Sequence, residues 1–78
     1  MVDEVLKVLK EEYPDIDFMS SDSLVQDGII NSLTLVGIIS ALSMEFGIEI
    51  TFQDINEENF KSVRAIAALV ERLSSSQS

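Results

Sequence analysis

The chain passes from loop to helix at Asp27-Gly28-Ile29-Ile30-Asn31-Ser32-Leu33. Glycine at position 28 permits a turn with a positive φ, which other residues resist. Asn31 and Ser32 are both favourable N-cap residues, and one of them is enough to cap the following helix. If Asn31 is the cap, the Ser32 hydroxyl is free, and an anion attached there would lie on unpaired backbone N–H groups. The stretch therefore predicts either a simple serine cap or an exposed serine that can carry an anionic group.

The segment after this turn predicts a helix from Ser32 to Phe46. Its apolar residues recur at three- and four-residue spacing and predict a broad buried face, formed by Leu35, Val36, Ile38, Ile39, Leu42 and Phe46. Gly47 is expected to end the helix as a left-handed C-cap. Residues 48–52 alternate as a strand does, but a lone strand has no partner for its backbone groups. We therefore expect an extended connector there.

The segment before the turn predicts a first helix, with Asp3 as its N-cap and an end at about Tyr13. Apolar residues recur there at helical spacing, and Pro14 disfavours helical geometry in the residue before it. Residues 14–31 then form a long connection that is rich in Asp and Ser. Its apolar residues predict a loop packed over the core, and they are Ile16, Phe18, Met19, Leu24 and Val25.

The last third of the chain predicts one short helical turn between Asp54 and Phe60 and a final helix through Leu73. Ser62 is the expected N-cap of that helix. One face of it is apolar and consists of Val63, Ile66, Ala67, Leu69, Val70 and Leu73. Residues 74–78 are expected to form a flexible tail. The sequence thus predicts one all-α domain over residues 1–73, a small four-helix bundle of three longer helices and one short helix.

The composition excludes several kinds of chemistry. The 78 residues include no histidine and no cysteine, which removes the usual general base, thiol chemistry, zinc sites and disulfides. An enzyme that used Ser32 as a nucleophile would have only carboxylates and lysines as bases. We therefore expect no catalytic residue, no metal site and no enzymatic activity.

The charge balance indicates which partners the chain avoids. Fourteen acidic residues against five basic ones give a net charge of −9, which repels nucleic acid and anionic membranes and favours partners with basic patches. No apolar run approaches the length that crosses a membrane, and no basic-then-apolar leader opens the sequence. We expect a cytoplasmic monomer.

Over residues 2–73 the chain resembles the acyl and peptidyl carrier protein family. The family signature is a glycine, about two variable residues and then Asp-Ser-Leu at the start of the second helix, and Gly28-Ile29-Ile30-Asn31-Ser32-Leu33 is similar to it. Three more segments match in order, residues 24–27, 46–50 and 58–63. The resemblance implies an acyl-carrier-protein fold. It also implies that a phosphopantetheinyl transferase adds 4′-phosphopantetheine from coenzyme A to Ser32, with Gly28, Asn31 and Leu33 completing the cofactor-binding site.

The resemblance further implies a function in which the thiol of the arm holds an acyl or aminoacyl intermediate as a thioester for delivery to partner enzymes. Two departures favour a specialised carrier over one of fatty acid synthesis: Asn31 replaces the usual aspartate, and Glu45 is the only carboxylate of the second helix. Such a carrier would work with an adenylating synthetase, or with acyltransferase and condensing enzymes. The alternative is a non-catalytic helical interaction module that is not phosphopantetheinylated.

The middle of the second helix leaves one further choice open. Gly37 costs about 1 kcal/mol there relative to alanine, so the residue needs a reason. That reason is either close packing against a neighbour or a smooth docking surface shared with Leu33, Ser40 and Met44.

Overall fold

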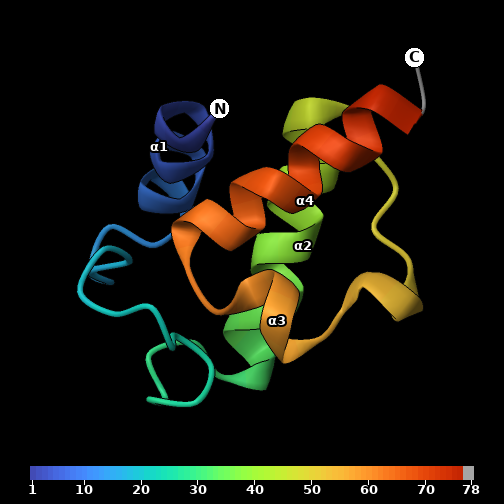
Figure 1. Ribbon diagram of the computed structural model, residues 1–78. Coiled ribbons are helices and arrows are strands. Elements are labelled where there is room, and N and C mark those ends of the chain that lie inside the picture. Colours follow the sequence, from blue (N-terminus) through green and yellow to red (C-terminus); the bar gives the residue numbers. More distant parts are fainter. Residues whose placement is uncertain (77–78) are drawn as a thin grey trace.

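The computed structural model describes residues 1–76 and shows a bundle of helices joined by two long connections (Figure 1). Its elements in chain order are α1 (Val2–Glu12), α2 (Ser32–Phe46), the 3-10 turn η1 (Phe52–Asp54), α3 (Glu57–Phe60) and α4 (Val63–Ser76). The described part of the chain contains no strand. The predicted all-α bundle of three longer helices and one short helix is therefore confirmed, and the expected extended connector over residues 48–52 is one residue shorter, because η1 begins at Phe52.

Helix α1 begins two residues before its predicted position. Met1 is the N-cap and makes no side-chain capping hydrogen bond, so the prediction of Asp3 as the cap is wrong. Asp3 and Glu4 lie instead in the first turn, where carboxylates interact favourably with the positive end of the helix dipole. At the other end, the backbone N–H of Tyr13 donates to the carbonyl of Leu9 at 2.8 Å, and Pro14 follows.

Helix α2 has the predicted bounds. Gly47 ends it in the left-handed conformation, with φ 61° and ψ 38°, and donates its N–H to the carbonyl of Ser43. Ile38 and Leu42 are fully buried, but Val36 is 65% exposed, so its predicted place on the buried face is wrong. The helix carries apolar residues around more of its circumference than α1 and α4 can cover, and Val36 lies on the uncovered side.

The core forms where α1, α2 and α4 contact one another, and the loop between α1 and α2 closes it. Phe18 and Leu24 of that loop are fully buried, and Ile30 is 2% exposed, which confirms a loop packed over the core. Each such side chain contributes about 1.5–3 kcal/mol of burial free energy. Met19 is 56% exposed, so its predicted packing is wrong.

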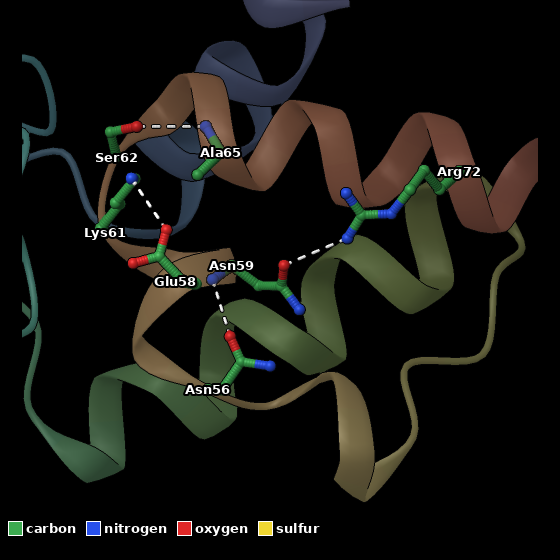
Figure 2. Close-up of polar contacts among 7 residues, drawn as sticks. All are labelled: Asn56, Glu58, Asn59, Lys61, Ser62, Ala65 and Arg72. Atoms are coloured by element: carbon green, nitrogen blue, oxygen red, sulfur yellow. Dashed lines mark hydrogen bonds and ion pairs between the residues drawn. The ribbon is translucent and has the colours of Figure 1, made fainter.

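Helix α4 begins as predicted and ends later. The N–H of Ala65 donates to the Ser62 hydroxyl at 3.1 Å, which confirms the predicted cap (Figure 2). The helix continues to Ser76, three residues beyond the predicted end at Leu73, because no glycine or proline follows Leu73 to stop it. The flexibility of residues 74–78 stays a prediction, and residues 77–78 lie outside the described part.

The single turn expected between Asp54 and Phe60 is confirmed as α3, which polar contacts hold against α4 (Figure 2), and the additional turn η1 precedes it. Asn56 caps α3 by accepting from the N–H of Asn59 at 2.9 Å. The Asn59 side chain donates to the carbonyl of Asp54 at 2.8 Å and accepts from Arg72 of α4 at 3.1 Å. A four-residue helix is unstable alone. Asn59 therefore connects η1, α3 and α4 and keeps the short helix in place.

Candidate functional site

The N-terminus of α2 is capped by Asn31. Its backbone is extended, with φ −97° and ψ 179°, and its side-chain oxygen accepts from the N–H of Thr34 at 2.8 Å. Its carbonyl accepts from the N–H of Leu35 at 2.9 Å. Ser32 is the first helical residue, so the capping role that a serine often fills belongs to its neighbour. Of the two alternatives for this turn, the structure shows the one that leaves the Ser32 hydroxyl free.

Ser32 and Leu33 present unpaired polar groups at this end of the helix. Both residues are exposed, and the Ser32 hydroxyl has no hydrogen-bond partner among residues 1–76. Neither does the backbone N–H of Ser32 or of Leu33 within that range. These N–H groups lie at the positive end of the α2 dipole, where a phosphate group is stabilised. An exposed hydroxyl beside two free donors suits the phosphodiester of a phosphopantetheine arm.

Gly28 shapes the turn that leads into the helix. Its φ is 76°, a conformation that side-chain-bearing residues rarely adopt, and its N–H donates to the carbonyl of Val25 at 3.1 Å. A Cβ built on Gly28 would meet no atom within 4 Å. The backbone conformation, not lack of space, therefore requires glycine at this position.

Leu24 holds the same turn in place through its backbone hydrogen bonds and its buried side chain. Its carbonyl accepts from the N–H groups of Ile29 at 3.0 Å and Ile30 at 3.1 Å, while its own N–H donates to the carbonyl of Lys61 at 2.8 Å. Its side chain is fully buried. Leu24 thus joins the residues that precede Ser32 to the junction between α3 and α4. The sequence predicts the packing of Leu24 but not its role in positioning the turn. The one local sign of that role is an apolar residue within a polar loop.

Side-chain hydrogen bonds also hold the loop at Asp27. The Ser21 hydroxyl donates to the Asp27 carboxylate at 2.5 Å, and the N–H of Ser23 donates to the Ser21 hydroxyl at 2.9 Å. Asp27 is the last charged residue before the helix, because residues 28–44 include none. The surface that starts at Ser32 is therefore uncharged along most of α2.

Several large apolar side chains are exposed to solvent along that uncharged surface. Leu33 is 85% exposed, Val36 65% and Met44 83%, with exposed Ser40 between them at helical spacing. Gly37 is different, because a Cβ there would lie 3.1 Å from the Tyr13 Cζ and closer still to the Tyr13 hydroxyl. Of the two reasons considered for this glycine, close packing is the one that the structure shows.

The predicted site residues come together in part. Asn31, Ser32 and Leu33 form the exposed start of α2, and Gly28 supplies the turn four residues earlier. Within residues 1–76, no three His, Cys, Asp or Glu side chains gather as metal ligands would. The helices of that same part are each too short or too polar to cross a membrane.

Comparison with known proteins identifies this arrangement. The family model described as "Phosphopantetheine attachment site" matches residues 1–70, which include α1, α2, α3 and the first half of α4. No curated protein and no solved structure matches the chain.

Proposed function

The chain belongs to the family of phosphopantetheine attachment domains, and on that basis we propose that Ser32 is the residue to which the 4′-phosphopantetheine arm is attached. Domains of this family are non-catalytic carriers that hold this prosthetic group. The observation that supports Ser32 is its free, exposed hydroxyl at the first position of α2, beside a neighbour that already caps the helix.

Each residue near Ser32 has a task in this proposal. Asn31 holds the helix start, so that the Ser32 hydroxyl can be modified without loss of the cap. The N–H groups of Ser32 and Leu33 stabilise the charge of the phosphodiester. Gly28 and Leu24 fix the preceding turn and thereby set the direction in which Ser32 faces solvent.

The attached arm supplies a thiol on which an acyl or aminoacyl group is held as a thioester. A phosphopantetheinyl transferase adds the arm, and an adenylating synthetase, or acyltransferase and condensing enzymes, load and use the cargo. The protein works in the cytoplasm as a monomer in biosynthesis, without nucleic acid or membrane partners. The net charge of −9 supports these exclusions, because it opposes contact with phosphate-rich surfaces.

The uncharged face of α2 supports a specialised carrier. Leu33 and Val36 offer apolar area near Ser32, Met44 adds apolar area toward the other end of the helix, and residues 32–44 include no carboxylate, so an enzyme that docks there recognises shape and apolar burial more than charge. Ser40→Asp places a charge in this face, whereas Ser40→Asn adds a side chain of the same size without one. Loading by a cognate adenylating synthetase should be slowed by the aspartate and little affected by the asparagine. Equal loading of both variants would place docking elsewhere, for instance on the loop that precedes Ser32.

Intact mass after incubation with a transferase and coenzyme A tests the attachment itself. The unmodified sequence and a Ser40→Ala control should each gain the mass of one arm, and Ser32→Ala should gain none. Circular dichroism should show that Ser32→Ala remains helical. If the unmodified sequence gains no mass from several transferases, the chain is the unmodified interaction module instead.

A further inference from the structure

The two ends of α2 differ in chemistry. The Ser32 end is uncharged, as residues 28–44 show, while the other end faces α1 across an acidic groove. The groove consists of two adjoining hollows, of about 170 Å³ and 480 Å³, which share Val8, Glu11 and Glu45. We call it the α1–α2 groove.

Carboxylates dominate the rim of the α1–α2 groove. Glu4, Glu11 and Glu12 border it from α1 and Glu45 borders it from α2, while Lys7 is the only basic side chain in its lining. All four glutamates are exposed, and none of them forms an ion pair or hydrogen bond within residues 1–76. The rim is therefore strongly negative, and its charges are available to a partner.

Apolar atoms form the base of the groove. Val8, Ala41 and Phe46 of the lining are half-buried, and Met44, which also lines the groove, is 83% exposed. An unbranched methionine side chain adapts to different apolar surfaces. An apolar base between negative rims matches an amphipathic helix that has apolar residues on one face and Lys or Arg on both sides of that face.

We propose that the α1–α2 groove binds a basic amphipathic helix of a partner protein. A second copy of this chain is a poor occupant, because it also carries a net charge of −9. Glu45 lies thirteen residues after Ser32 on the same helix, which is about 20 Å along its axis. The groove can therefore hold one partner while the Ser32 end contacts an enzyme. This inference does not depend on attachment of the arm at Ser32.

The first test is a titration of the ¹⁵N-labelled full chain with a synthetic helix-forming peptide that has leucines on one face and lysines on both sides. The expected amide shifts lie in residues 4–12 and 41–46, with little change at residues 28–36. A peptide of the same composition in scrambled order should bind at least about tenfold more weakly. Shifts centred on residues 28–36, or equal binding of the scrambled peptide, would overturn the proposal.

Matched variants separate the groove from general charge attraction. The groove variant combines Glu11→Gln, Glu12→Gln and Glu45→Gln; the control variant combines Asp15→Asn, Asp22→Asn and Glu71→Gln. Both remove three negative charges at exposed positions. Peptide affinity should fall about tenfold in the groove variant and less than about threefold in the control. An equal loss of affinity in both variants would show that the peptide responds only to the net charge of the protein, which contradicts a specific groove.

Three further measurements define the occupant and separate this proposal from the previous one. Met44→Gln, at an exposed helical position, should weaken the peptide severalfold without changing the helical content. Ser32→Ala should bind the peptide as the unmodified sequence does, so failure of arm attachment and failure of groove binding are distinguishable. Spermine should shift the same amides far less than the peptide. Comparable shifts with spermine would make the groove a site for small cations and would overturn the proposal.

Discussion

The Tyr13 side chain lies directly against Gly37, so that the end of α1 packs on the middle of α2 without room for a Cβ. Tyr13 is half-buried at the edge of the core, and its rigid ring cannot fold away from a new atom as a longer flexible side chain could. The contact joins the first helix to the helix that begins at Ser32. It explains why a poor helix former is found in the middle of α2.

Gly37→Ala should therefore destabilise the protein although alanine is the better helix former. The propensity gain is about 1 kcal/mol, and displacement of the Tyr13 ring by overpacking costs about 1–3 kcal/mol. In a Tyr13→Phe background the closest atom is gone, and the same substitution should be neutral or stabilising. Urea unfolding of the four proteins measures the coupling. An equal effect of Gly37→Ala in both backgrounds would contradict this packing.

Asn31 should contribute to stability, and Ser32 should contribute little. Asn31→Ala removes the acceptor for the Thr34 N–H and should cost about 1 kcal/mol of unfolding free energy. Asn31→Asp keeps an acceptor and adds a charge at the positive end of the dipole, so modification of Ser32 should be equally fast or faster. Thermal unfolding and the rate of mass gain check both expectations. A larger loss of stability in Ser32→Ala than in Asn31→Ala would contradict the assignment of the cap.

Salt should stabilise the fold at neutral pH. Fourteen acidic residues face five basic ones, and Lys61 with Glu58, at 3.0 Å, forms an exposed ion pair that contributes little. Sodium or magnesium chloride screens the self-repulsion, so the Tm should rise at low to moderate ionic strength. The variant with Asp15→Asn, Asp22→Asn and Glu71→Gln should show a smaller rise. A flat response of the unmodified sequence would exclude self-repulsion as a significant stability term.

Asp54 should make η1 sensitive to acid. Hydrogen bonds from the Thr51 backbone N–H at 3.0 Å and the Thr51 hydroxyl at 2.9 Å lower the pKa of the Asp54 carboxyl. A lowered folded pKa gives stability that is fully present above the unfolded pKa, about 3.9, and is lost as pH falls through the folded value. Thr51→Val should raise the Asp54 midpoint in a ¹³C titration, and Thr51→Ser should retain it. The same midpoint in all three proteins would contradict the contribution of the Thr51 hydroxyl, because Thr51→Val keeps the backbone N–H bond.

Local signals in the sequence were enough to predict most of the fold. Gly28, Asn31 and Gly47 each have a conformational reason that acts within a few residues, so both ends of α2 were predicted correctly. The Ser62 cap and the apolar face of α4 follow from equally local patterns. The start of α1 was less clear, because an acid in the first turn looks like an acid at the cap, and Asp3 occupies the first turn.

Contacts between distant segments were outside the reach of these patterns. Periodicity predicts Val36 in the core because α2 is apolar on several sides, and it does not show which side α1 and α4 cover. Local patterns do not give the reason for Gly37, since it depends on Tyr13, twenty-four residues away along the chain. The role of Leu24 depends similarly on the Lys61 carbonyl. The candidate site could be predicted because its residues are neighbours in sequence.

The position of the arm is the most direct test of the central claim. Fragment-ion mass spectrometry of the transferase-treated, unmodified sequence can distinguish Ser32 from the serines at positions 40 and 43 of the same helix. The account predicts a single added arm, borne by the fragment that contains Ser32 and by none that lacks it. An arm on Ser40, Ser43 or any other serine, or an arm that persists in Ser32→Ala, would contradict it.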